Sequence, residues 1–256
     1  MDIQKILKQY RAGEIDLTAA EENIRSMGFL AVSDIAKIDT YRCKRTGVPE
    51  AVLAEGKKTK DLIKIVRAQM ESNGRVLVTR VSKKKLKALQ SEFEFIENGK
   101  SASVCIVHDG KTKRKENGGL VAFISAGTAD ISVLEEAKMT AEEMGCQTIE
   151  IYDVGVAGYQ RLFLEADKLK DAKPDAVVVA AGREGTLPTV VAGIIDAPVI
   201  GLPVSTGYGA GKSGQAALLS MLQSCSVISV VNIDAGFVAG AYAARIANRM
   251  EKLRRK

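Results

Sequence analysis

The second half of the chain alternates short apolar runs with helix-like segments five times, and this alternation restricts the fold more than any other feature. The runs predicted as strands are 120–125, 147–153, 175–181, 198–202 and 227–233, and the helices that follow them are 131–144, 159–170, 187–195, 213–223 and 236–252. The runs 120–125 and 175–181 are almost continuously apolar, which is typical of parallel strands covered on both faces. We therefore predict an α/β fold, with a doubly wound five-stranded parallel sheet as the middle of three layers.

The residues before this alternation predict a smaller α/β region with a different organisation. Its expected elements are two short helices over 3–28, helices at 60–72 and 83–91, and strands at 75–81 and 103–107. Residues 29–57 show no clear pattern. The polar, glycine-ended segment DGKTKRKENGG predicts a linker over 109–118. We expect an N-terminal helical and small α/β region at 1–108 and a C-terminal domain at 119–256.

Charge distinguishes the two regions. Residues 1–118 hold 24 basic and 16 acidic side chains, whereas residues 119–256 hold 13 basic and 15 acidic ones. A basic region can attract a polyanion, but a solvated lysine-rich surface has the same composition. Lys83, Lys84, Lys85 and Lys87 fit the start of an exposed helix. Because no nucleic-acid-binding motif accompanies them, we expect no nucleic-acid partner.

Histidine and cysteine usage excludes several classes of site. The chain has one histidine, His108, so a multi-histidine metal site is impossible. Its four cysteines form no CxxC pair, which leaves a zinc or thioredoxin-type site without support. No apolar run of about 18 residues predicts a membrane span, and no secretory leader is evident at the N-terminus. We expect a cytoplasmic protein with reduced thiols.

Ligands of doubly wound folds bind beyond the carboxyl ends of the strands, so the loops that follow the strands are the candidate binding loops. The first loop runs from Ser125 to Asp130. Gly127 lets the backbone approach a ligand, and Ser125 and Thr128 offer hydroxyl groups to a phosphate at the helix start. Asp130 can cap the helix or orient a ribose or a ring substituent. A capped turn without any ligand explains these residues equally well.

The next two loops add glycines and charge. After the second strand, Asp153 is followed by Gly158 and Arg161, a combination that fits a phosphate or a carboxylate. After the third strand, Arg183 and Glu184 stand between glycines, which is unusual for a simple connection.

The fourth loop and a lone cysteine complete the candidate residues. Ser205 and Lys212 belong to a glycine-rich loop that predicts anion binding. A Walker loop is excluded because position 206 is threonine where glycine is required. Cys225 is flanked by serines between the fourth helix and the fifth strand. A lone cysteine is usually a small buried apolar residue.

Several of these stretches together resemble the aminoimidazole ribonucleotide carboxylase superfamily. They are Ser125 to Asp130 with Glu135-Glu-Ala137, Leu187-Pro188 with Val191-Ala-Gly193, and Pro198 to Val204. The resemblance implies a three-layer, flavodoxin-like domain of the PurE type. The purine enzymes carry a histidine after the second strand and another before the Leu-Pro pair, where this chain has Ala157-Gly158-Tyr159 and Thr186.

The chain is more similar to the LarB-type family of nickel-pincer cofactor biosynthesis, a relative of the purine carboxylases. The matching stretches are 45–50, 55–57, 153–158, 182–188, 205–209, 220–225 and 231–237. This resemblance implies an enzyme that carboxylates nicotinate adenine dinucleotide with CO2 or bicarbonate and cleaves its phosphoanhydride to release AMP. It also implies a homo-oligomer, an octamer in the related carboxylases. We expect no membrane partner. We also expect no organic cofactor, because the dinucleotide is the substrate.

The resemblance assigns roles to the candidate residues. Cys225 is expected to be a nucleophile that adds to the pyridinium ring, Glu184 to transfer a proton, and Asp130 to assist or to orient the substrate. The residues expected to bind substrate are Ser125, Gly127, Thr128, Asp153, Gly158, Arg161, Arg183, Ser205 and Lys212. Mg2+ is expected for the hydrolytic step, with ligands that the sequence does not identify. The alternatives are a carboxylase or mutase of purine biosynthesis and a non-catalytic nucleotide-binding module.

Overall fold

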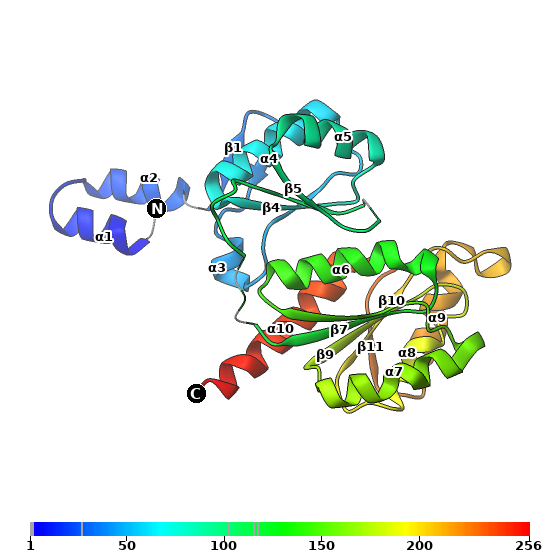
Figure 1. Cartoon of the computed structure of the whole chain (residues 1–256). Helices are drawn as coiled ribbons and strands as arrows, with labels where there is room; N and C mark the ends of the chain where they lie inside the picture. The colour runs from blue at the N-terminus through cyan, green and yellow to red at the C-terminus, as the bar shows by residue number, and fades with distance from the viewer. Residues whose placement is uncertain (1–2, 27, 102, 115, 117) are drawn as a thin grey trace.

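The computed structural model describes residues 3–26, 28–101, 103–114, 116 and 118–256. It contains two main sheets, one from each half of the chain, with helices between and around them (Figure 1). Position 27 of the expected second helix and positions 115 and 117 of the expected linker lie outside the described residues. The division of the chain into two domains at that linker stays a prediction.

The C-terminal sheet has the predicted five parallel strands, in the order β11-β10-β9-β7-β8. The strands are β7 (Leu120–Ser125), β8 (Gln147–Ile151), β9 (Ala176–Ala181), β10 (Val199–Pro203) and β11 (Ile228–Val230). The chain builds outward from β7 to β8 on one side and from β9 to β11 on the other. The strand order therefore reverses between β7 and β9, and such a reversal opens a crevice at the carboxyl edge of a doubly wound sheet.

Helices cover both faces of this sheet, as predicted. One face carries α6 (Ile131–Glu143) and α10 (Gly236–Arg254), and the other carries α7 (Tyr159–Ala172), α8 (Leu187–Ala192) and α9 (Gln215–Leu222). Successive strand side chains point to opposite faces. Thus Val121 and Phe123 are buried with α6 and α10, whereas Ala122 and Ile124 are buried with the other three helices.

The N-terminal sheet has four strands in the order β3-β4-β6-β5, with a parallel β3–β4 pair and antiparallel neighbours otherwise. Its strands are β3 (Ala51–Leu53), β4 (Arg75–Thr79), β5 (Phe95–Asn98) and β6 (Cys105–His108), covered by α4 (Thr59–Asn73) and α5 (Lys83–Glu92). The remaining elements are α1 (Ile3–Arg11), α2 (Leu17–Ser26), the β1 (Leu30–Val32) and β2 (Ala36–Ile38) hairpin, and α3 (Arg42–Thr46). Sequence analysis had left β1, β2, α3, β3 and β5 unassigned.

The second face of the N-terminal sheet lies on the helices of the C-terminal sheet. Leu77 of β4 and Ile106 of β6 are buried against Met139 of α6, with Phe237 of α10 beside them. Figure 1 shows the resulting order of layers: α4 and α5, the N-terminal sheet, α6 and α10, the C-terminal sheet, then α7 to α9. Helices α6 and α10 are therefore covered on two sides, one by each sheet.

The starts of α2, α4 and α5 differ in how they are capped. Asp16 caps α2 by accepting the Ala19 N–H at 2.7 Å. Thr59 is the first residue of α4 and follows Lys58, whose side chain makes no capping bond. The lysine run was predicted correctly, since α5 begins at Lys83.

None of the helices among the described residues has the length and apolarity needed to span a membrane.

Candidate functional site

The carboxyl edge of the C-terminal sheet brings five loops together, because parallel strands all end at the same edge. These carboxyl-edge loops are 126–130, 152–158, 182–186, 204–214 and 231–235. Every predicted site residue except Cys225 lies on these loops, at the end of β7, or in the first turn of α7. Loops 126–130 and 182–186 flank the point where the strand order reverses.

Asp130 ties three of these loops together. It ends the 3₁₀ helix η1 (Thr128–Asp130) and is only 5% exposed. One carboxylate oxygen accepts the Gly127 N–H at 2.9 Å, and the other accepts the Thr206 hydroxyl at 2.9 Å. Burial raises the pKa of Asp130, while hydrogen bonds from Gly127, Thr206 and the Gly182 backbone oppose the rise. Its carboxylate thus holds the loops in place at the crevice.

Two glycines permit the close approach of the loops. A Cβ atom at Gly182 would lie 2.4 Å from the Thr206 hydroxyl and 3.1 Å from an Asp130 carboxylate oxygen. A Cβ atom at Gly155 would lie 2.8 Å from the Ala126 carbonyl oxygen. Larger residues at either position would push the loops apart, so these glycines serve the packing of the crevice.

Strained backbone is concentrated at the same edge. Asp153, Arg183, Ser213 and Asp234 all have φ between 44° and 62°, in the left-handed region that non-glycine residues rarely adopt. Such residues cost on the order of 1–3 kcal/mol each and gather at binding and catalytic sites. Each of the four lies in a different carboxyl-edge loop.

The loop after β8 is held to the first loop and carries an ion pair. The Asp153 N–H donates to the Ser125 hydroxyl at 3.1 Å, and Ser125 is fully buried. Arg161 binds the Asp153 carboxylate and packs over Gly158. A cavity of about 340 Å³ lies beside this pair. Ser125 is enclosed by protein, whereas Arg161 is exposed and free to exchange its partner for a ligand.

The loops after β9 and β10 present exposed charged groups. The Arg183 guanidinium lies over the Tyr208 ring, 4.6 Å from its centroid. Glu184 and Lys212 are exposed, and neither has a hydrogen-bonding or ionic partner among the described residues. Thr128 and Ser205 are also exposed at this edge. These groups are available to a ligand in the crevice without breaking an existing contact.

The N-terminal half contributes a residue that sequence analysis missed. Arg80, just after β4, donates to the Asp234 carbonyl at 2.9 Å, and Asp234 in turn accepts the Ser205 N–H at 2.9 Å. Burial raises the pKa of neighbouring Glu136, which accepts the Phe237 N–H. Asp234 had a sequence signal, as an acidic residue in the 231–237 stretch after a strand. Arg80 had none, because its partner is distant in the chain.

Cys225 lies away from the other predicted site residues. It follows α9, which returns the chain from the carboxyl edge to the amino edge, and it precedes β11. Its neighbours Ser224 and Ser226 bond to Thr189 of α8, at 2.8 and 3.0 Å. Its side chain is exposed. One copy of the chain therefore does not bring Cys225 to the carboxyl-edge loops that hold the other predicted site residues.

The other cysteines differ in exposure. Cys105 and Cys146 are buried, and burial raises the pKa of each thiol to about 12, so both stay protonated. Cys43 is exposed on α3. Cys225 is thus one of two exposed thiols.

The residues at the carboxyl edge do not form a ready-made metal cage. Among the described residues, no three or more His, Cys, Asp or Glu side chains gather closely enough to hold an ion. Mg2+ is commonly bound by one or two carboxylates together with substrate phosphates. Glu184 and Asp234 fit that lighter requirement, since Glu184 is exposed and Asp234 has only one carboxylate oxygen engaged by a described donor.

The only histidine lies in the N-terminal sheet, not at this edge. His108 ends β6, stacks on Phe95 with ring centroids 5.5 Å apart, and faces Glu97 at 3.4 Å. At the position after β8 where the purine-type pattern has histidine, the chain forms the 3₁₀ helix η2 (Val156–Gly158). The carboxyl edge therefore contains no imidazole.

Comparisons with known proteins agree with this architecture. Residues 30–109 match the LarB/PurE-like N-terminal domain, and residues 120–256 match AIR carboxylase. An uncharacterized protein of Methanocaldococcus jannaschii is 38% identical, with 98% of this chain and 99% of the relative covered. The N5-carboxyaminoimidazole ribonucleotide mutase of Pyrococcus horikoshii is 30% identical over 53% of this chain and 79% of its own. The corresponding M. jannaschii mutase is 32% identical over 50% and 78%. The chain belongs to the AIR carboxylase (PurE-like) superfamily and is a LarB-like member of it.

Proposed function

We propose that this protein is a carboxylase of the LarB type, which adds CO2 to the pyridinium ring of nicotinate adenine dinucleotide and hydrolyses its phosphoanhydride. The family matches support a carboxylase-type enzyme. The substrate and the order of steps are our inference. The products are a dicarboxylated pyridinium mononucleotide and AMP.

The position of His108 carries the proposal. Purine carboxylases of the related pattern use imidazole at the carboxyl edge, and here the single histidine belongs to the N-terminal sheet. A mechanism for this chain has to proceed without imidazole. An exposed thiol and carboxylates supply the needed nucleophile and proton acceptor.

Thiolate addition makes the electron-poor ring reactive. The Cys225 sulfur forms a bond to the ring carbon para to nitrogen, and the displaced electron pair neutralises the ring nitrogen. The free meta carbon becomes an enamine carbon and forms a bond to CO2. Loss of its proton to Glu184 and departure of the thiolate restore the aromatic ring. The net change replaces one ring hydrogen by a carboxylate and releases one proton.

The carboxyl-edge loops supply the binding groups in this proposal. Arg161, Arg183 and Lys212 neutralise phosphates and the ring carboxylate, while backbone N–H groups near Gly127 face the phosphates. Asp130 acts by holding the loops. Glu184 or Asp234 would hold Mg2+ beside the substrate phosphates, where the ion would supply charge neutralisation for phosphoanhydride cleavage by water.

The proposal requires a second copy of the chain. Cys225 is at the amino edge and the binding loops are at the carboxyl edge, so a ring held by the loops of one copy meets the thiol of another. A homo-oligomer, which the family resemblance implies, provides that arrangement. The exposed apolar residues around this thiol, Leu219, Leu222 and Val227, fit a surface covered by a neighbouring copy.

The direct test is turnover of the named substrate. The protein is incubated with nicotinate adenine dinucleotide, bicarbonate and Mg2+, and the products are identified by mass. We expect AMP and a mononucleotide heavier than nicotinate mononucleotide by one CO2. Carbon-13 bicarbonate should add its label to that product. A Cys225→Ala variant with full activity would rule out the covalent step.

The purine reaction is the second candidate, because two relatives are mutases of that class. The same preparation is therefore offered aminoimidazole ribonucleotide with bicarbonate, and separately its N5-carboxylated form. Turnover of either, with none of the dinucleotide, favours the purine reading. Dinucleotide binding without turnover, and without any effect of Cys225→Ala, favours a non-catalytic module.

A further inference from the structure

A second concentration of charge lies in a cleft between the N-terminal sheet and the ends of α6 and α10. We call it the interlobe cleft; its volume is about 980 Å³, and its basic lining residues are Lys44, Arg45, Arg75, Lys113, Arg114, Arg245, Arg249, Lys252 and Arg255. Its acidic lining residues are Asp39, Glu50 and Glu143. Because α6 and α10 end at the amino edge of the C-terminal sheet, this cleft is remote from the carboxyl-edge loops.

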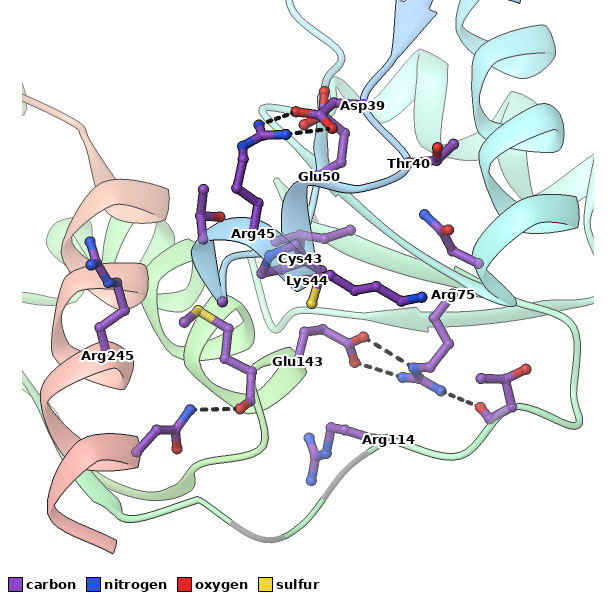
Figure 2. Close-up of a pocket in the computed structure, with 18 of the residues that line it drawn as sticks. Asp39, Thr40, Cys43, Lys44, Arg45, Glu50, Arg75, Arg114, Glu143 and Arg245 are labelled. Atoms are coloured by element: carbon purple, nitrogen blue, oxygen red, sulfur yellow. Dashed lines mark hydrogen bonds and ion pairs between the residues drawn. The ribbon is translucent and has the colours of Figure 1, made fainter. Parts of the chain in front are cut away.

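Some of these cations are already neutralised. Arg75 binds Glu143 at 2.7 Å and Glu97 at 3.0 Å, and Arg45 binds Asp39 at 2.6 Å. Figure 2 shows the Arg75–Glu143 pair across the middle of the cleft and the Arg45–Asp39 pair at its upper end. These pairs fix the frame of the cleft and leave the other cations to face its interior or its rim.

Five lining cations have no carboxylate partner among the described residues: Lys44, whose ammonium lies over the Tyr41 ring, and Lys113, Arg245, Arg249 and Lys252. Arg245, Arg249 and Lys252 follow each other at helical spacing, so they share one face of α10. Lys113 approaches from the segment that joins the two sheets. Like charges that converge on a cavity repel one another, and an anion between them removes that repulsion.

The two ends of the cleft differ in the charge of their side chains. Asp39 and Glu50 lie at one end, and burial raises the pKa of Glu50 although Arg42 lies 3.3 Å away. In Figure 2 this carboxylate end is opposite Arg114, with Arg245 on α10 at the side. Carboxylates accept hydrogen bonds from hydroxyl or amino groups and repel phosphate. A ligand that fits both ends carries phosphates at one end and hydroxyl-bearing groups at the other.

We propose that the interlobe cleft binds a nucleotide through at least two phosphate groups, independently of the carboxyl-edge loops. The phosphates lie between Lys113 and the basic face of α10, and the ribose and base extend toward Asp39 and Glu50. The volume suits such a ligand, since small-molecule sites measure roughly 300–1,000 Å³. The ligand bridges the two halves of the chain and stabilises their contact.

The test uses ADP as the probe and calorimetry on the full-length protein. We expect saturable binding that weakens with added salt, tighter than AMP or inorganic phosphate, and a rise in Tm. The double variant Arg245→Glu/Arg249→Glu should weaken ADP binding by roughly tenfold or more. The matched control, Lys84→Glu/Lys87→Glu, reverses two charges on α5 outside the cleft and should bind ADP as the wild type does.

A third variant separates the two sites. Arg161→Ala/Lys212→Ala removes cations at the carboxyl edge and should leave the interlobe affinity for ADP unchanged. Loss of ADP binding in this variant, with no loss in Arg245→Glu/Arg249→Glu, would overturn the proposal and assign the binding to the carboxyl edge. Single-stranded RNA that binds the wild type more tightly than ADP, and competes with it, would overturn it in favour of a nucleic-acid surface.

Discussion

The two edges of the C-terminal sheet differ in how their polar groups are satisfied. At the carboxyl edge, Asp130 and Asp234 accept hydrogen bonds from the loops around them, and Arg80 anchors the N-terminal half there. At the amino edge, Cys225 is exposed, and the interlobe cleft has cations without carboxylate partners among the described residues. The chain thus fixes the loops of the first edge with its own hydrogen bonds, whereas at the second edge it leaves an exposed thiol and a group of converging cations for another molecule.

The largest expected effect concerns whether the two edges meet across copies of the chain. Cys225→Ala and Asp130→Asn should each lower kcat/KM by about 100-fold or more, the first through the nucleophile and the second through loop geometry. Mixed oligomers formed from the two inactive variants should regain about a quarter of wild-type activity. They contain sites that combine an intact thiol from one copy with intact loops from another.

The control is a mixture of Cys225→Ala with Cys225→Ser, which contains no intact thiol and should stay inactive. Native mass spectrometry verifies that mixed oligomers have formed. Verified mixtures of Cys225→Ala and Asp130→Asn that stay inactive would show that the two edges do not share a site across copies.

A smaller effect tests how tightly the carboxyl edge is closed. Gly182→Ala places a methyl group 2.4 Å from the Thr206 hydroxyl, so we expect a loss of about 2 kcal/mol in the free energy of unfolding. Urea denaturation measures it. Gly193→Ala is the matched control, because its nearest contact is 3.4 Å and its φ of −81° suits alanine. Equal stabilities of the two variants would contradict a tightly packed crevice.

Asp130 at the carboxyl edge should make the stability of the protein depend on pH. The pKa of Asp130 is raised in the folded protein, so the folded state binds more protons than the unfolded state above pH 3.8. The stability of the wild type relative to Asp130→Asn should therefore fall as the pH rises from about 4 through the raised pKa. Urea denaturation at several pH values measures this difference.

Asp109 provides a comparison of opposite sign. Hydrogen bonds from Thr112 and Lys111 lower its pKa to about 2, so its contribution is present above pH 3.8 and lost as the pH falls toward 2. The stability of the wild type relative to Asp109→Asn should therefore fall on acidification. The same sign in both variants would contradict the burial assigned to Asp130.

The smallest effect concerns the anchor between the two halves. Arg80→Ala removes an exposed contact to Asp234 and an exposed ion pair with Glu55, and should cost about 0.5–1 kcal/mol. Amide exchange in residues 231–235 should become faster. Arg67→Ala removes an exposed pair with Glu92 inside the N-terminal half and should leave that exchange unchanged. Unchanged exchange in Arg80→Ala would mean that the carboxyl edge holds without this anchor.

The sequence predicted features that depend on neighbouring residues better than features that depend on contacts between distant residues. The inner strands of the C-terminal sheet were found because burial on both faces makes them almost continuously apolar, as in β9. Strands β1, β2 and β3 have three residues each, too few to show a period, so they were missed. The carboxyl-edge residues were found because glycines and charged residues follow buried strands directly.

The sequence by itself determined the five β-α units, the loops that meet at one edge, and the absence of imidazole from that edge. These depend on periodicity and on residue identity, which are local. Only the tertiary structure decided that Asp130 joins three loops, that Arg80 reaches Asp234, and that cations from four segments line one cleft. Each of these depends on contacts between residues far apart in the chain, and such contacts leave no pattern along it.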